Sequence, residues 1–289
     1  MALAPAPLVA QRARLTDRAC SDTLAGTATA RRPAPPSQPS LTWRDGPVAW
    51  TEWPVQLGRR AVPVTVVVAR FNPTQLPLAL EIARTGEALG PWSIDVAPPQ
   101  ALVAFNAGQF TDDGPWGWVV HRGREWQAPG SGALAASIVV DSSHRVHIVT
   151  PSQASAWHTG SARGSVLEAL QSYPQLLADG RLPRALCRVG AINRGHRDIR
   201  LALGLLPDGR VLVALTRYAP AALLPEAASR LPIGPTTLEM AEIMWRLGAV
   251  DAVMLDGGLS AQLLIRDATG VHRWPGLRSV PLAIVGTPR

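Results

Sequence analysis

Two short polar turns in this sequence follow apolar runs and carry side chains that could do chemistry. The first is Asn106–Phe110, which reads NAGQF, and the second is Asp256–Ser260, which reads DGGLS. A carboxylate such as Asp256 can take or give a proton, or hold a cation, and an asparagine offers both a donor and an acceptor. Glycines beside these groups allow positive φ and a close approach of the backbone to a ligand. Either turn alone could equally be a plain glycine turn with a capping polar residue.

Short apolar runs precede both turns and predict the strands that would position them. Val250–Leu255 precedes the second turn, Leu263–Ile265 follows it, and Ala101–Phe105 precedes the first. Runs of this length, bounded by turn residues, are typical of buried strands. We therefore expect the two turns to lie side by side, at the carboxyl ends of neighbouring strands.

A helix is predicted over Pro235–Gly248, directly before the strand that leads into the second turn. Thr236 and Glu239 have the spacing of a capping box, and Gly248 stands where a helix usually ends. Apolar residues recur at three- and four-residue steps between them, which indicates one buried face.

The run from Thr236 to Leu264 resembles the C-terminal signature of the phosphodiester glycosidase family, whose turn reads LDGGGS. FNAGQF resembles the family's NGGFF signature, and the segment 171–180 resembles a stretch around Pro-Leu-Leu and Asp-Gly. Arg200 stands where the family's RTAIG motif has its arginine. The departures from these patterns are Ala107, Gln109, Leu201 and Leu259.

The resemblance implies a set of site residues. Asp256 would be the essential carboxylate, acting as acid, base or ligand of a divalent cation, and Arg200 would hold a phosphate, because its planar fork suits phosphate recognition. The second carboxylate stays open among Asp112, Asp113 and Asp198. Asn106 is expected beside them as the third catalytic residue, which shapes the pocket. The substrate-binding residues expected are Gly108, Gln109, His196, Asp198, Gly257, Gly258 and Ser260.

The remaining pattern predicts an α+β fold, with a mostly antiparallel or mixed sheet and a few flanking helices. Val62–Phe71 and Val280–Val285 read as strands, and hairpins are expected over 133–150 and 201–216. A second helix is expected over Ser165–Tyr173, because Ser165 and Glu168 have capping-box spacing. These strands and helices do not alternate as a doubly wound fold requires.

The chain divides into two regions by composition. Residues 1–40 are rich in Ala, Pro, Ser and Arg, which predicts a disordered or linker-like segment. Residues 41–289 are expected to form one domain. The two cysteines, Cys20 and Cys187, could pair, but their number alone does not decide it.

The charge and hydropathy of the sequence bear on three classes of partner or location: nucleic acids, membranes and the export pathway. All 28 basic residues are arginine and the formal net charge is +7, but the charge is spread along the chain and no nucleic-acid-binding motif is evident. No apolar run is long enough to span a membrane. Ala2–Ala10 is apolar but lacks a basic segment before it, so it is a poor signal peptide as written. Export to the periplasm or the medium is implied only by the family resemblance.

The resemblance therefore predicts a hydrolase that cleaves a glycosidic bond, at a sugar-1-phosphodiester of an envelope glycan or exopolysaccharide. The alternative is a non-catalytic protein of the same fold that binds a glycan or peptidoglycan.

Overall fold

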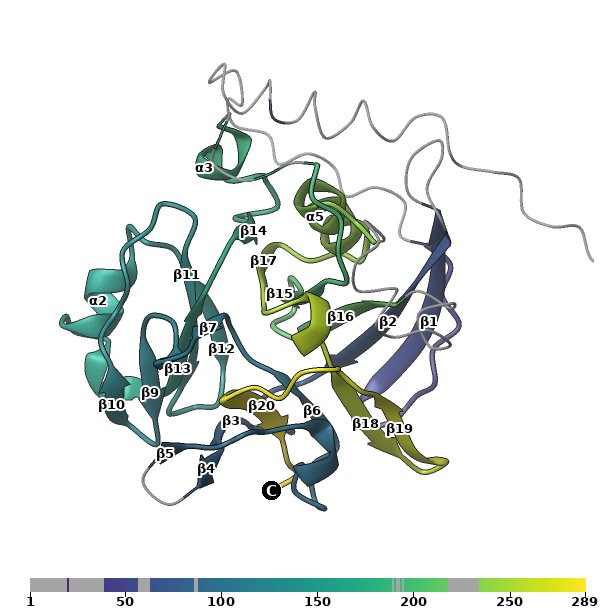
Figure 1. The fold of residues 1–289 in the computed structure, drawn as a ribbon, viewed down its shortest axis with the longest axis horizontal. Coiled ribbons are helices and arrows are strands. Elements are labelled where there is room, and N and C mark those ends of the chain that lie inside the picture. Colours follow the sequence, from purple (N-terminus) through teal and green to yellow (C-terminus); the bar gives the residue numbers. More distant parts are fainter. Residues whose placement is uncertain are drawn as a thin grey trace, which may run out of the picture.

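The computed structural model describes residues 20, 39–56, 63–85, 88–188, 190, 193, 195–217 and 234–289. Apart from Cys20, Pro39 and Ser40, the segment expected to be linker-like lies outside the described residues. The described residues form three antiparallel sheets that pack around a shared centre (Figure 1).

The first sheet has six strands in the order β1-β2-β16-β15-β17-β14. Its strands are β1 (Ala49–Gln56), β2 (Pro63–Phe71), β14 (Gln175–Leu177), β15 (Leu201–Leu205), β16 (Val211–Arg217) and β17 (Asp251–Met254). The expected hairpin over 201–216 is confirmed as β15 and β16, which pair from Leu201 opposite Leu215 to Leu205 opposite Val211.

The other two sheets have five strands each. One has the order β10-β9-β13-β11-β12, and the other has the order β19-β18-β6-β20-β3. Their bounds are β3 (Leu78–Ile82), β6 (Val103–Asn106), β9 (Val119–His121), β10 (Arg124–Gln127), β11 (Ala136–Asp141), β12 (Val146–Val149), β13 (Val166–Ser172), β18 (Leu263–Asp267), β19 (Gly270–Trp274) and β20 (Leu282–Gly286). The remaining strands are the short pairs β4 (Arg84–Thr85) with β5 (Ala88–Leu89), and β7 (Phe110–Thr111) with β8 (Gly114–Pro115).

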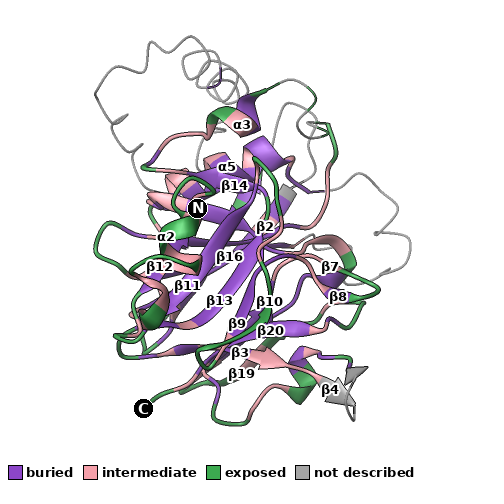
Figure 2. Cartoon of the chain, turned by 90° about the vertical axis from the view of Figure 1, so that its left-hand side faces the viewer, coloured by how far each residue is buried: buried purple, intermediate pink, exposed green. Residues whose placement is uncertain are grey.

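The prediction of a helix over Ser165–Tyr173 is wrong, because this segment forms the strand β13. Arg163–Ser165 makes a single 3-10 turn (η2), and the strand then runs between β9 and β11. Nearly every residue of β13 is buried (Figure 2), so the sequence shows no alternation of polar and apolar residues. Glu168 bonds the His121 ring at 3.0 Å instead of capping a helix. Pairing on two edges and burial on two faces outweigh the helix propensity of leucine, glutamate and alanine.

Helices are few. Within the described residues they are α2 (Ala154–His158), α3 (Arg184–Cys187) and α5 (Thr237–Arg246), together with the 3-10 turns η1 (Ile94–Val96), η2 and η4 (Gly258–Ser260). The fold is therefore predominantly β with few helices. The expected antiparallel sheets are confirmed, and the helical share is smaller than expected. No helix among the described residues is long and apolar enough to cross a membrane.

The predicted helix before the second turn is confirmed as α5. Thr236 and Glu239 form the capping box: the Glu239 N–H donates to the Thr236 hydroxyl oxygen at 3.2 Å, and the Thr236 N–H donates to the Glu239 carboxylate at 2.8 Å. The apolar face of α5 packs on the first sheet through Met240 and Met244, both fully buried. A Cβ on Gly204 of β15 would lie 2.8 Å from the Met244 side chain, so glycine lets the helix approach the sheet.

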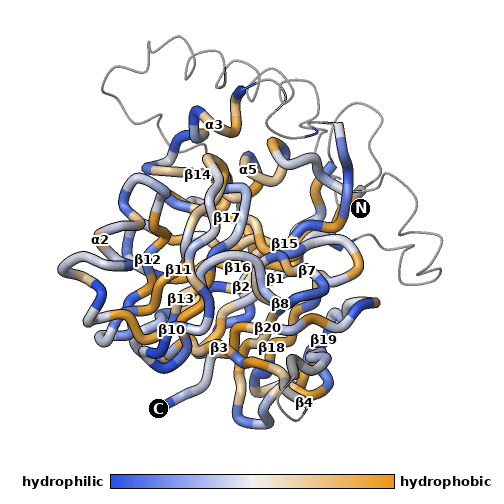
Figure 3. Tube along the Cα trace, turned by 60° about the vertical axis from the view of Figure 1, so that its left-hand side comes forward, coloured by the Kyte–Doolittle hydropathy of each residue, from blue (hydrophilic) through white to orange (hydrophobic). Residues whose placement is uncertain are grey.

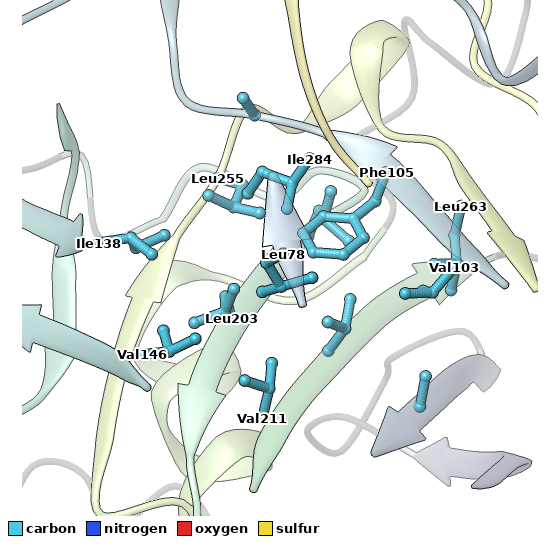
Figure 4. Close-up of a cluster of buried hydrophobic side chains, with 14 of the residues drawn as sticks. Leu78, Val103, Phe105, Ile138, Val146, Leu203, Val211, Leu255, Leu263 and Ile284 are labelled. Atoms are coloured by element: carbon cyan, nitrogen blue, oxygen red, sulfur yellow. The ribbon is translucent and has the colours of Figure 1, made fainter. Parts of the chain in front are cut away.

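The inner faces of the three sheets meet in one hydrophobic core (Figure 4). Leu203 comes from the first sheet, Ile138 from the second and Phe105 from the third, and each is at most 2% exposed. Hydropathy along the chain agrees, because hydrophobic segments gather where the strands meet and hydrophilic segments follow the outer turns (Figure 3). Burying each such side chain contributes roughly 1.5–3 kcal/mol. The strands that lead into both polar turns are therefore firmly held.

A disulfide joins Cys20 to Cys187 across a sequence separation of 167 residues. Both cysteines are buried against Leu186 and Leu238. The pairing that the sequence left open is therefore made, and it tethers position 20 of the N-terminal segment to α3.

Candidate active site

The two polar turns meet, as expected. The Asn106 amide donates a hydrogen bond to the Asp256 main-chain carbonyl at 2.9 Å, and the Asp256 N–H donates to the Ala107 carbonyl at 3.0 Å. The strands that carry the turns, β6 and β17, belong to different sheets rather than being neighbours in one sheet. The site therefore lies where two sheets approach each other, and the core that joins them aligns the two turns.

Asn106 is the residue that ties the turns together. Its side chain is fully buried, and its amide oxygen accepts a hydrogen bond from the Gln262 N–H at 2.9 Å. Gln262, also buried, donates in turn to the carbonyls of Ser260 and Arg278. The hydrogen-bond partners of the Asn106 side chain are main-chain groups, so this side chain holds the two turns in position.

Asp256 is a half-buried carboxyl group whose surroundings disfavour its charged form. Burial raises its pKa, and the negative charge of Asp198 adds to that rise. Hydrogen bonds from the Ser260 hydroxyl and the Gly257 N–H, and the positive charge of Arg278, oppose it. A raised pKa favours the protonated form of a carboxyl group, which is the form that can donate a proton.

The glycines of the second turn allow another segment, 198–200, to pack against it. The Gly258 N–H donates to the Ile199 carbonyl at 2.8 Å, and a Cβ on Gly257 would lie 2.6 Å from the same oxygen. Gly258 has a φ of +59°, and a Cβ there would lie 2.9 Å from the Asp198 carboxylate. Close approach of the backbone therefore requires glycine at Gly257, and the positive φ favours glycine at Gly258.

Asp198 is the second carboxylate that the structure brings to Asp256. It interacts electrostatically with Asp256, its side chain is 35% exposed, and His196 lies 3.6 Å from it. Asp112 and Asp113, the other two candidates, are exposed in the turn between β7 and β8, which is the solvated hairpin tip.

Arg200 is a buried cation whose charge acts on Asp198. It is 8% exposed, and its guanidinium donates to the carbonyls of Pro235 at 3.3 Å and His196 at 3.0 Å. Burial lowers its pKa, and the negative charge of Asp198 opposes that change. An arginine nonetheless stays charged, so Arg200 supplies a fixed positive charge next to Asp198.

Gly108 and Gln109 shape the first turn. A Cβ on Gly108 would lie 2.7 Å from the Gln171 carbonyl, so only glycine fits there. The Gln109 amide donates to the Tyr173 carbonyl at 2.6 Å and accepts from the Tyr173 N–H at 3.1 Å. The departure from the family's aromatic residue therefore fixes the turn to the end of β13, and Gln109 engages the protein itself.

Arg278 is a site residue that sequence reasoning missed. It lies in the loop before β20, its N–H donates to the Leu259 carbonyl at 3.0 Å, and its guanidinium lies 4.8 Å from the centre of the Phe110 ring. The loop is exposed at this residue, unlike Arg200. Its only signal in the sequence is an arginine just before a closing strand, far from either turn.

No group of three or more His, Cys, Asp or Glu side chains in the described parts of the chain is arranged to hold a metal ion. Within the described residues, the site thus consists of Asp256 and Asp198, the arginines Arg200 and Arg278, and the two polar turns.

Comparisons with known proteins identified one matching family and several similar structures. The sequence profile described as "Phosphodiester glycosidase" matches residues 99–285, which is more than half of the chain. The catalytic domain of zebrafish N-acetylglucosamine-1-phosphodiester alpha-N-acetylglucosaminidase, auto-inhibited by its pro-peptide, superposes with a TM-score of 0.67 at 13% identity, over 91% of this chain and 94% of that one. A hypothetical protein from Synechocystis superposes with a TM-score of 0.55 at 18% identity, over 90% of this chain and 65% of that one. No curated protein matched the sequence significantly.

Proposed function

Because this chain belongs to the phosphodiester glycosidase family, we propose that it is a hydrolase that cleaves the bond between the anomeric carbon of a sugar and the oxygen of a phosphodiester. The observation that carries the proposal is the half-buried carboxyl group of Asp256, which bonds Ser260 and Gly257 and interacts electrostatically with Asp198 and Arg278. Glycoside hydrolysis uses a carboxyl pair in which one member is protonated and the other is charged.

In the proposed reaction, water attacks the anomeric carbon. The bond between this carbon and the bridging oxygen breaks, and the oxygen leaves with the phosphorus. One carboxylate, which we assign to Asp198, takes the proton from the attacking water. Asp256 protonates the departing oxygen, so the products are the free sugar and a phosphate monoester. Arg200 offsets the negative charge of the phosphate, because a guanidinium in a partly desolvated site attracts an anion more strongly than it would in water.

The substrate we propose is a glycan of the cell envelope or an exopolysaccharide, and the place of action is the periplasm or the medium. The disulfide between Cys20 and Cys187 supports this location, because such bonds form and persist in oxidising compartments.

The test is a panel of sugar-1-phosphodiesters assayed for release of free sugar, with and without a chelator. The variant Asp256→Asn should lower kcat by about 10²–10⁴-fold with less effect on KM, because it removes the proton that the leaving group needs. The matched control is Asp208→Asn, the same substitution in the exposed turn between β15 and β16, where Asp208 bonds Arg210 at 2.8 Å. Its activity should equal that of the parent protein.

Arg200→Lys separates phosphate recognition from chemistry. It keeps the charge and loses the planar fork, so phosphodiesters should suffer more than neutral glycosides of the same sugar. Unchanged turnover by Asp256→Asn would refute the assigned role. A protein that binds the sugars of the panel but releases none of them would instead be the non-catalytic glycan-binding protein.

A further inference from the structure

Large hydrophobic side chains are exposed at few places in the described part of the chain, and most of these places adjoin the candidate site. Five such side chains are at least 39% exposed: Val96, Trp126, Tyr173, Leu259 and Leu277. Leu259 belongs to the Asp256 turn, Leu277 bonds Leu259, and Tyr173 is held by Gln109 of the first turn. Scattered exposed leucines need no explanation, whereas Leu259 and Leu277 lie in two segments that bond each other, one of which carries Asp256.

The two leucines are fixed in place. The N–H groups of Leu277 and Arg278 both donate to the Leu259 carbonyl, at 2.7 Å and 3.0 Å. A Cβ on Gly276 would lie 3.0 Å from that carbonyl, so the loop sits directly on the turn. The Arg217 guanidinium anchors the start of the loop by donating to the Pro275 carbonyl at 3.0 Å. The exposure of Leu277, 57%, is therefore a property of an ordered loop.

Arg278 places a positive charge next to the exposed pair of Leu259 and Leu277. Arg278 stacks on the Phe110 ring, and its charge acts on the Asp256 carboxyl group. Its guanidinium is therefore close to both turns, while its neighbour Leu277 faces solvent. A cation next to two exposed leucines matches a ligand in which an anion is joined to an apolar chain.

We propose that the loop 275–278 and Leu259 form the subsite for the alcohol half of the substrate, with Arg278 against the phosphate and the two leucines against an apolar alcohol such as a lipid chain. This proposal rests on the proposed function and specifies its substrate: a sugar-1-phosphodiester of an apolar alcohol. Hydrolysis would then release the free sugar and the alkyl phosphate monoester. Leu259, which replaces a glycine of the family pattern, supplies part of the contact.

The test compares two esters of one sugar-1-phosphate, using the sugar that the panel above identifies. One carries a methyl group and the other an octyl group, both below the concentration at which octyl esters form micelles. The wild-type protein should favour the octyl ester by about tenfold in kcat/KM, since a few methylenes against an apolar surface discriminate by that order.

Leu259→Ser and Leu277→Ser should each reduce this preference severalfold, measured as the ratio of kcat/KM for the octyl ester to kcat/KM for the methyl ester. Val96→Ser, which removes an exposed apolar side chain of η1, is the matched control and should keep the preference. Arg278→Gln should lower kcat/KM for both esters by a similar factor, because both carry the phosphate.

Binding provides a readout that does not need turnover. Octyl phosphate should bind the wild-type protein about tenfold more tightly than methyl phosphate in calorimetry, and Leu277→Ser should remove that difference. Equal treatment of the two esters and of the two phosphates would overturn this proposal while leaving the hydrolase assignment intact. Release of no sugar from any ester would refute the hydrolase assignment, and the calorimetry would still decide the apolar subsite. A wild-type dimer that Leu277→Ser converts to a monomer would assign the leucines to a subunit contact and overturn the proposal.

Discussion

Replacing Asn106 by alanine should lower the free energy of unfolding by about 2–4 kcal/mol. The substitution leaves the buried Gln262 N–H without its acceptor, and an unsatisfied buried donor costs about 1–3 kcal/mol. The Asp256 carbonyl also loses a donor, but water can reach this half-buried residue, so we assign that loss about 1 kcal/mol. The larger part of the effect therefore comes from the link between the first turn and Gln262.

Urea unfolding followed by tryptophan fluorescence measures the change. The matched control is Asn72→Ala, because the Asn72 amide oxygen accepts hydrogen bonds from Thr74 in an exposed turn, at 3.0 Å from its N–H and 2.8 Å from its hydroxyl. Water can replace both bonds there, so the control should lose about 1 kcal/mol or less. If Asn106→Ala unfolds at the same urea concentration as the control, Asn106 does not hold the two turns together and our account of the site's rigidity is wrong.

Three further predictions concern pH, glycine and the disulfide. The charge of Asp198 raises the pKa of Asp256 and the charge of Arg278 lowers it. Asp198→Asn should therefore lower the pKa of the Asp256 carboxyl group and Arg278→Gln should raise it, as read from the NMR titration of that carboxyl group, which does not need turnover; shifts in the same direction would contradict this. Gly258→Ala should destabilise the fold, measured by urea unfolding, and reduce activity, measured by sugar release. The control Gly209→Ala is also at positive φ but has no neighbour within 4 Å, so it should lose only the backbone strain of about 1–2 kcal/mol. Equal activity of the two variants would argue against an essential contact between residue 258 and Asp198. Removing the disulfide by substituting either cysteine with serine should destabilise the protein by about 2–5 kcal/mol, and an unchanged urea midpoint would show that the pairing does not constrain the unfolded chain.

The parts of the site that could be predicted from the sequence are those set by local signals. The capping box of Thr236 and Glu239 defines the start of α5, and glycines directly after an apolar run define the second turn. These signals act within a few residues, so the structures that they predict do not depend on contacts with distant parts of the chain. β13 had equally good local signals for a helix and formed a strand, because its fate depends on the two strands that flank it in space.

The parts that could not be predicted depend on contacts between distant segments. Arg278 reaches Asp256 because its loop bonds Leu259, and nothing in its local sequence indicates that contact. Gln262 reads as one polar residue in an apolar run, yet it joins Asn106, Ser260 and Arg278. The burial of Asn106, which makes it a positioning residue, likewise follows from the packing of two sheets.

The disulfide has a consequence for any proteolytic processing of this protein. It closes a covalent loop across a sequence separation of 167 residues, from Cys20 to Cys187. A protease that cuts the main chain once inside this loop would separate the sequence into two pieces without releasing either one. Such nicked protein would run at full mass on a denaturing gel without reductant and as two fragments with it. Detachment of the N-terminal fragment would thus require both a protease and a reductant. The redox state of the compartment would therefore decide whether the two fragments separate.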